Sequence, residues 1–445
     1  MSKYKIDKKK TWKFFNDLFP VNRSLTGSGN KFTLNYLKKN IVQNLKIKKI
    51  KSGSKVFDWK VPSEWIVEKA FLKNKNNKKI IDFKKNNLHL IGYSKSFQGT
   101  LRKKKILKHI HTLKKYPSWI PYRTSYYSYN WGFCATENLL KSKDFVGPFK
   151  VKIKTKFNKT GSLIFGEAFK RGKSKKEILL STYCCHPSLA NDNLSGILTA
   201  SMLFNYISSI KTKFSYRLVI APETIGALCF LKNSNLKNII GGTILTCTAG
   251  PNKLSMKESF NKNHWINIAT HSALKKYTNN NYKIYPFIPD GSDERQFSSP
   301  SFRINTPSVH KSKYYDYPEY HTSADNLKFI SIENFSETFN FYVEWFKLIE
   351  RLNVPVKTLS FGEYQLGKRN LYPNVGGAIK QRANKVKSKT KSNITNVTEK
   401  NLDAFHWIMH LADGSKTNEQ ISEISGINLK IINKSLRIFR KKGLI

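Results

Sequence analysis

Four loops between residues 186 and 325 carry residues that could bind a metal or transfer a proton. In chain order they contain His186 with Asp192, Glu223, Asp293 with Glu294, and His321 with Asp325. Imidazole and carboxylate ligands without thiolates are typical of a hydrolytic zinc site with one open coordination position. Such a metal lowers the pKa of its bound water to about 7, and a nearby carboxylate then accepts the proton.

These loops follow segments with the pattern of buried strands. Residues 177–180 and 216–221 are short apolar runs that end in turn residues, and residues 196–204 have helical spacing. Strands that alternate with helices predict an α/β fold with a mainly parallel sheet and helices on both faces. Ligands bind at the carboxyl ends of strands in such sheets, which is where His186 and Glu223 are expected.

Upstream of this region the sequence predicts two helices and a β-rich segment. Helical spacing over 12–19 and 31–37 flanks the polar loop 23–29, which could bind an anion or simply connect the helices. Residues 55–165 carry short alternating runs with Asn, Gly and Lys turns, which predict an inserted β-rich domain. The aromatic segment 120–134 would either line a binding cleft or fill a small β core.

The end of the chain predicts a separate helical domain. Residues 355–397 read as a polar linker, and 398–445 contain three helical runs. Short helices, a glycine turn and a basic third helix resemble a winged helix-turn-helix. This domain could bind DNA, but a packing or dimer role is favoured because base-reading residues are few. The α/β domain would then comprise residues 1–54 and 166–354.

The composition is that of a globular protein. The formal net charge is +50, but Lys outnumbers Arg by more than five to one and is spread along the chain. Specific nucleic-acid recognition favours Arg, so nucleic acid is not a favoured partner. No apolar run approaches the roughly 18 residues of a membrane helix, no signal peptide is visible, and five irregularly spaced cysteines predict no disulfide framework. We expect a cytoplasmic location, and a homo-oligomer is left open.

Several motifs resemble those of zinc-dependent aminopeptidases of the bacterial leucyl aminopeptidase and glutamate carboxypeptidase type. His186 followed by Asp192-Asn-Leu-Ser-Gly196 is similar to their His…Asp-Asn-x-Ser-Gly motif. More closely, the chain resembles a bacterial aminopeptidase-like family of poorly known function. The shared motifs include Arg-Ser-Leu-Thr-Gly, Asp-Trp-x-Val-Pro-x-Glu-Trp, Pro-Glu-Thr-Ile-Gly and Tyr-Pro-Glu-Tyr-His-Thr-Ser. The resemblance implies an inserted β-rich domain, a winged helix and genes that often lie among those for surface-polysaccharide synthesis.

The resemblance also implies a role for individual residues. Glu223 would be the general base. The metal ligands would be His186, Asp192 and His321, and Asp293 would either bind the metal or orient a ligand. The substrate, a small peptide or an amide-bearing sugar, would contact Arg295, Tyr320 and Trp131.

Two departures from the aminopeptidase pattern limit the predicted metal content. Glu223 is followed by Thr224 where the aminopeptidases have a second glutamate, and no acid lies in Cys247–Gly250 after the next strand. One zinc ion is therefore favoured over two. The leading hypothesis is a zinc-dependent hydrolase of an amide bond. The alternative is a catalytically degenerate binding or regulatory protein that keeps the aminopeptidase fold and acts through its C-terminal helix-turn-helix.

Overall fold

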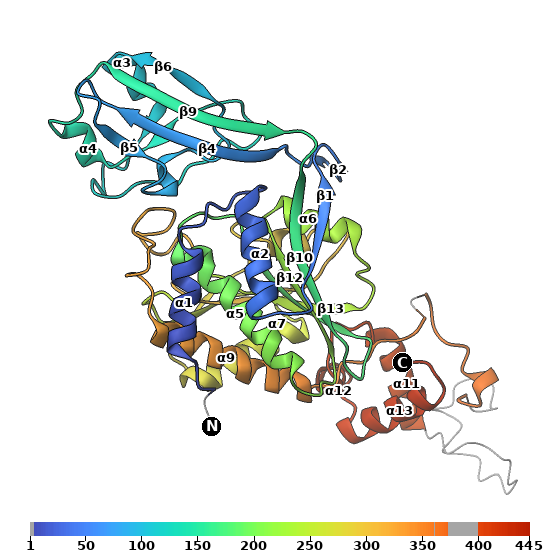
Figure 1. Ribbon diagram of the computed structural model, residues 1–445. Helices are drawn as coiled ribbons and strands as arrows, with labels where there is room; N and C mark the ends of the chain where they lie inside the picture. Colours follow the sequence, from blue (N-terminus) through green and yellow to red (C-terminus); the bar gives the residue numbers. More distant parts are fainter. Residues whose placement is uncertain (1–3, 360, 373–398) are drawn as a thin grey trace, which may run out of the picture. The chain divides into compact units, whose positions relative to one another are not determined.

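The computed structural model describes residues 4–359, 361–372 and 399–445 (Figure 1). The chain divides into two compact units, Met1–Lys262 with Ala269–Glu350, and Asn263–Ile268 with Arg351–Ile445. None of the helices in these described ranges combines the length and apolar character needed to cross a membrane.

An eight-stranded sheet forms the centre of the first unit. Its strand order is β1-β10-β12-β11-β13-β16-β14-β15. The strands are β1 (Lys46–Lys51), β10 (Ser162–Lys170), β11 (Glu177–Tyr183), β12 (Ser215–Ala221), β13 (Ile239–Ile244), β14 (Leu254–Lys257), β15 (Lys283–Tyr285) and β16 (Ser308–Lys311). The pairs β12-β11, β11-β13, β13-β16 and β14-β15 are parallel, and the others are antiparallel. The sheet is therefore mainly parallel, as predicted.

Helices cover both faces of this sheet. Every residue of β11 is buried, as expected for a strand covered on both sides. Leu179 belongs to the same buried cluster as helix α6 (Ile225–Asn233). Its neighbours along the strand point to the opposite face, where α5 (Gly196–Ser208) contacts β11 and β12 (Figure 1). The remaining helices of this region are α1 (Lys8–Leu18), α2 (Ser28–Asn40), α7 (Trp265–Thr278), α8 (Glu294–Phe297) and α9 (Ile332–Arg351).

The β-rich segment forms its own antiparallel sheet within the first unit. The strand order is β5-β4-β9-β6, formed by Lys79–Asp82, Glu64–Lys73, Phe149–Asn158 and Phe97–Leu101. Two short pairs accompany it, β2 (Lys55–Val56) with β3 (Trp59–Lys60), and β7 (Ile110–His111) with β8 (Phe133–Cys134). Short helices α3 (Lys103–Ile106) and α4 (Glu137–Lys141) lie between strands. Along β9 the apolar side chains are buried and most lysines are exposed, so one face of the sheet is packed.

One strand differs from its predicted place. The sequence assigns residues up to 165 to the inserted domain, but β10, which begins at Ser162, pairs with β12 in the eight-stranded sheet. The unexpected strand β1 then pairs with β10. The alternating pattern of a strand does not identify its partner, because pairing depends on contacts with residues distant in the sequence.

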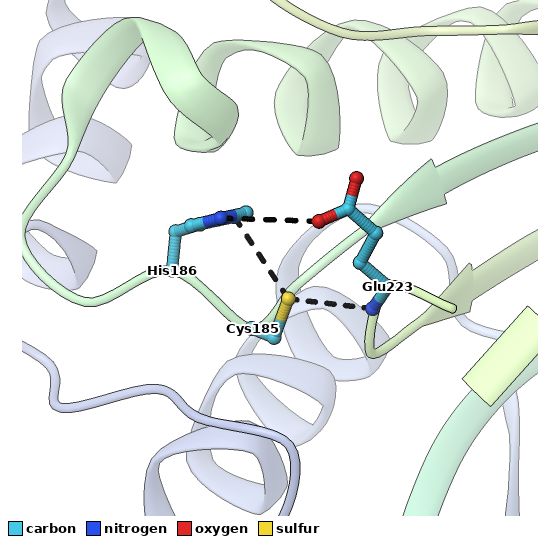
Figure 2. Close-up of side chains that lie close together, drawn as sticks. All are labelled: Cys185, His186 and Glu223. Atoms are coloured by element: carbon cyan, nitrogen blue, oxygen red, sulfur yellow. Dashed lines mark hydrogen bonds and ion pairs between the residues drawn. The ribbon is translucent and has the colours of Figure 1, made fainter. Parts of the chain in front are cut away.

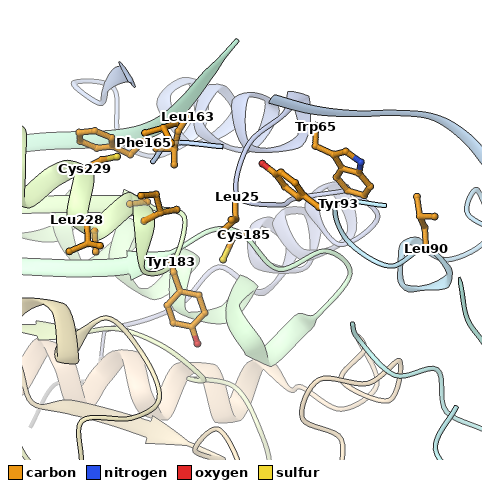
Figure 3. Packing of buried hydrophobic residues seen from close by; sticks show 14 of the residues in the cluster. Leu25, Trp65, Leu90, Tyr93, Leu163, Phe165, Tyr183, Cys185, Leu228 and Cys229 are labelled. Atoms are coloured by element: carbon orange, nitrogen blue, oxygen red, sulfur yellow. The ribbon is translucent and has the colours of Figure 1, made fainter. Parts of the chain in front are cut away.

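A continuous buried cluster joins the β-rich segment to the eight-stranded sheet (Figure 3). Trp65 and Tyr93, whose rings stack at 5.5 Å, contribute from the β-rich side. Phe165 from β10 and Leu228 from α6 contribute from the other side. Tyr183 and Cys185, at the carboxyl end of β11, belong to the same cluster. This packing anchors the loop that carries His186.

In the part of the second unit that the structure describes, the α-helices include α11 (Glu399–Leu411), α12 (Asn418–Ser425) and α13 (Leu429–Lys441). Phe405, Ile421 and Phe439 are among the side chains of their common core. A capping box starts α12, and Gly426, at φ 67°, ends it. The helices agree closely with the expected runs, whereas the winged helix-turn-helix assignment stays a prediction. The predicted linker lies outside the described residues from position 373 onward.

Candidate metal centre

Two histidines and an aspartate meet at the carboxyl end of β11. His186 follows this strand, Asp192 lies in the short π-helical segment η3 (Ala190–Ser195), and His321 lies between β16 and α9. One ligand atom of each residue lies within 4.8 Å of those of the other two. His321 Nε2 is 3.0 Å from Asp192 Oδ2. The structure thus brings together three of the four predicted metal ligands, whose role stays a prediction.

The burial and charge of this cluster fit a cation. Asp192 is fully buried, and apart from their mutual contact at 3.0 Å neither its Oδ2 nor His321 Nε2 has a hydrogen-bond partner among the described residues. Burial would raise the pKa of Asp192, but the two imidazoles outweigh it and lower this pKa to about 2. Burial lowers the pKa of His186 to about 4, which keeps its imidazole neutral and able to bind a metal. Two imidazoles and a carboxylate are a donor set that suits zinc.

Hydrogen bonds from outside the cluster hold the Asp192 loop in place. Tyr183 donates its hydroxyl to Asp192 Oδ1 at 2.5 Å. The carboxylate of Asp325 accepts the backbone N–H groups of Asn191, at 2.6 Å, and Asp192, at 2.9 Å. The peptide bond between Asp192 and Asn193 is cis. Burial raises the pKa of Asp325 to about 7. These contacts orient the proposed ligand, as is common around bound metals.

Arg23 gives the N-terminal loop a role that neither sequence interpretation anticipated. Its side chain is 1% exposed. Nε donates to the carbonyl of His186 at 3.0 Å, and Nη1 donates to the carbonyl of Leu18 at 2.7 Å. Burial lowers its pKa to about 10. The loop therefore fastens the backbone of His186 to the end of α1.

Glu223 follows the end of β12, and its carboxylate points toward His186 (Figure 2). Its Oε2 lies 4.0 Å from His186 Nε2, and its backbone N–H donates to Cys185 Sγ at 3.3 Å. Burial raises the pKa of Glu223 well above its usual range, the charges of Asp293 and Asp192 raise it further, and Arg295 opposes them. A carboxylate with a raised pKa beside a metal-type cluster is suited to general-base catalysis.

Cys185, His186 and Glu223 form a second group of potential ligand atoms (Figure 2). Cys185 Sγ lies 3.8 Å from His186 Nδ1. Burial raises the pKa of the Cys185 thiol well above its usual value. Metals bind the thiolate, so this group suits a metal less well than the histidine–aspartate cluster does.

Asp293, the fourth predicted ligand, holds the backbone next to Glu223 instead. Thr224 has φ 63° and ψ −80°, which is strained for a residue with a side chain. Asp293 Oδ1 accepts the backbone N–H of Thr224 at 2.7 Å, and Arg295 Nη2 donates to the Thr224 hydroxyl at 2.9 Å. Among the described residues, Asp293 joins neither group of ligand atoms. Burial raises the pKa of Asp293 to about 7.

A cavity of about 600 Å³ opens beside the cluster. Its lining includes His186, Glu223, His321, Arg123, Arg295, Trp59, Tyr122, Tyr126 and Tyr127. Of the predicted substrate contacts, Arg295 lines this cavity, whereas Tyr320 stacks on the His321 ring at 3.9 Å. Trp131 is buried between Phe97 and His109 in the β-rich core and is not part of the lining. The aromatic segment 120–134 thus serves both predicted purposes.

Uncharged side chains occupy the two positions at which the resemblance to aminopeptidases would place further acidic ligands. Thr224 follows Glu223, and Cys247 lies with Sγ 3.9 Å from Asp192 Oδ1. Burial raises the pKa of the Cys247 thiol well above its usual value. These two positions add no anionic ligand to the cluster.

Sequence reasoning gave no role to Arg23, Tyr183 and Trp59. Tyr183 ends a buried strand immediately before the predicted site. This position in the sequence could have indicated that its side chain contacts the site. Asp325 was noted beside His321 but was not assigned as a support for Asp192. Arg23 and Trp59 carry no such local signal, because both reach the site from distant segments.

A mixed sheet with a buried histidine–aspartate cluster at its strand ends defines an aminopeptidase-like α/β protein. The zinc aminopeptidase BSAP from Bacillus subtilis has a similar fold, with a TM-score of 0.55 over 77% of this chain and 95% of that chain, at 11% identity. The chain itself matches, over residues 12–352, the family described as "Domain of unknown function (DUF4910)", and it belongs to that family.

Two similar proteins are from Clostridium acetobutylicum. One is named "Putative polysaccharide biosynthesis protein with aminopeptidase-like domain", and it is 35% identical over 426 residues, which is 95% of this chain and 92% of the relative. The other is a crystal structure described as a "putative peptidase", with a TM-score of 0.76 and 33% identity over 98% of this chain and 96% of that chain. The resemblance to an aminopeptidase-like family is thus confirmed.

Proposed function

We propose that this protein is a zinc-dependent hydrolase that cleaves an amide bond with a single metal ion. The observation that carries the proposal is the buried cluster of His186, Asp192 and His321, in which Asp192 Oδ2 and His321 Nε2 lie 3.0 Å apart and, among the described residues, have no further hydrogen-bond partner. These three residues would hold the ion. When bound, zinc acidifies a coordinated water and polarises the amide carbonyl.

The protein's own residues would then position the reactants and move the proton. Glu223 accepts a proton from the attacking water and delivers it to the leaving nitrogen. Asp293 and Arg295 hold the strained Thr224, which follows the base. Tyr183 and Asp325 keep the carboxylate of Asp192 directed toward the imidazoles.

The substrate is proposed to be a small peptide or an amide-bearing sugar precursor in the cytoplasm. The relative's name supports a connection with polysaccharide biosynthesis, and the other relative's description supports peptide-bond chemistry. The alternative is a non-catalytic protein that binds through its C-terminal helices. Duplex DNA binding that depends on salt and disappears without residues 395–445 would favour this alternative.

Metal removal tests the proposal. Protein purified without chelator is expected to contain about one zinc ion per chain, bound by three protein ligands with one position open. A chelator should abolish hydrolysis of a panel of peptides and N-acetylated sugars, and added zinc should restore it. A folded protein that takes up no zinc would refute the proposal.

Asp293→Asn is expected to shift the acidic limb of the kcat/KM profile to lower pH. The neutral amide still accepts the N–H of Thr224 but places no negative charge near Glu223. The pKa of Glu223 therefore falls, and the base stays ionised at lower pH. The measurement is the pH dependence of kcat/KM. Asp290→Asn, which removes an exposed carboxylate three residues away, should leave the limb in place, and an equal shift would contradict the argument.

A further inference from the structure

We propose that the cavity beside Glu223 takes an N-acylated substrate with a carboxylate or phosphate near the amide, and not a peptide with a free amino terminus. This inference rests on the proposed hydrolase function and names its class of substrate. It follows from the charges and the aromatic side chains that line the cavity.

The charge of Arg295 acts on the nearby carboxyls of Glu223 and Asp293, but among the described residues no carboxylate lies within ion-pair distance of its guanidinium. Its Nη2 donates to the neutral hydroxyl of Thr224, and its buried Nε has no hydrogen-bond partner in the described part of the chain. Across the described ranges, neither Arg295 nor Arg123 forms an ion pair with a carboxylate. The guanidinium of Arg217, in contrast, binds both Glu167 and Glu177. A planar guanidinium with free donors in a cavity is suited to bind a carboxylate or phosphate.

The charge balance of the cavity disfavours an ammonium group. Among the described lining residues, Glu223 alone carries a carboxylate, and the mechanism uses it as the base. Two positively charged side chains, Arg123 and Arg295, line the same cavity. A buried ammonium needs an anionic partner or several acceptors, and here its only carboxylate partner would be the base itself. An acylated nitrogen carries no charge and has no such requirement.

The exposed part of the lining offers an aromatic surface. Trp59 and Tyr127 are 39% and 55% exposed, and their rings meet edge to face at 5.5 Å. Aromatic rings that remain exposed in a cavity can pack against the apolar face of a ring-shaped ligand. With the two arginines, this surface suits an N-acetylated sugar that carries an acidic group.

Calorimetric titration of the full-length, zinc-loaded protein tests this inference. The ligands are N-acetylglucosamine 6-phosphate, N-acetylmuramic acid, neutral N-acetylglucosamine and, as an amine without the acyl group, glucosamine 6-phosphate. We expect at least one acidic N-acetyl sugar to bind at least about tenfold more tightly than the neutral sugar. The reason is that a hydrogen bond to a charged group contributes more binding free energy than one between neutral groups. Preference for the phosphate or the carboxylate identifies the acidic group. Glucosamine 6-phosphate should bind more weakly than its N-acetyl form.

Variants locate the site. Arg295→Gln and Arg123→Gln should each reduce affinity for the preferred acidic sugar by roughly tenfold, and should reduce affinity for the neutral sugar much less. Arg171→Gln removes the same charge from an exposed position and should have no effect. Arg295→Lys keeps the charge without the planar fork and should give an intermediate loss. Thermal unfolding of each variant verifies that the chain is folded.

The outcomes separate this inference from the proposed function. Equal affinity for acidic and neutral sugars, no binding of any ligand at millimolar concentration, or an equal loss in Arg171→Gln would overturn the inference. Efficient hydrolysis of neutral peptides with free amino termini would support the hydrolase function and also overturn the inference. Selective binding that depends on Arg295, without hydrolysis of any amide, would support the anion site and refute the hydrolase function.

Discussion

Glu223→Gln is expected to reduce the rate of amide hydrolysis by about 10²–10⁴-fold, the range for loss of a general base, while the protein keeps its zinc. The amide has the shape of the carboxylate but cannot take a proton from water. Glu223 Oε2 lies 4.0 Å from His186 Nε2, so the base adjoins the ligand cluster without belonging to its histidine–aspartate set. The measurements are kcat and the zinc content of the same preparation.

Glu319→Gln is the matched control for this prediction. It makes the same change in the loop that carries His321, at a residue that does not line the cavity. Its activity should remain near that of the unmodified protein. Unchanged activity in Glu223→Gln would show that another group accepts the proton. Loss of zinc in that variant would mean that Glu223 acts as a ligand.

Asp192→Asn is expected to reduce zinc affinity by more than about 100-fold, above the range known for residues that only support a ligand. The substitution removes the one anionic ligand from between His186 and His321 and can place an N–H group toward the ion. The side-chain oxygen of Asn can still accept the Tyr183 hydroxyl, so the metal-free protein should remain folded. Competition with a zinc-binding dye measures the affinity, and the rise in Tm with added zinc provides a second measurement.

Asp325→Asn provides a graded comparison for the zinc site. Asp325 contacts the backbone N–H groups of Asn191 and Asp192 and is not one of the clustered ligands. Its loss should reduce zinc affinity by about 10–100-fold, less than the loss of Asp192. If Asp325→Asn had the larger effect, or if neither substitution changed zinc binding, the ion would not bind where we propose.

Local sequence patterns were sufficient to predict the elements that present the site. The apolar run 177–180 and the helical spacing of 196–204 correspond to β11 and α5, and the run 216–221 corresponds to β12. Periodicity along the chain encodes burial directly, so strands and helices of this kind can be recognised from residue types alone. For the same reason the loops of His186 and Glu223 were correctly expected at strand ends.

Contacts between distant segments required the tertiary structure. Trp131 and Trp59 are both tryptophans in the β-rich segment, yet the first packs between Phe97 and His109 and the second lines the cavity. Asp293, whose role as a metal ligand stays a prediction, contacts the backbone N–H of Thr224, a contact that no local pattern indicated.

The sequence by itself determined the α/β elements, the residue types of the site and the absence of acids at Thr224 and in 247–250. Only the tertiary structure decided that Arg23 fastens His186, that Asp325 supports Asp192 and that β10 joins the large sheet. The physical reason is that periodicity records whether a side chain is buried, whereas its partners depend on how segments far apart in the chain pack together.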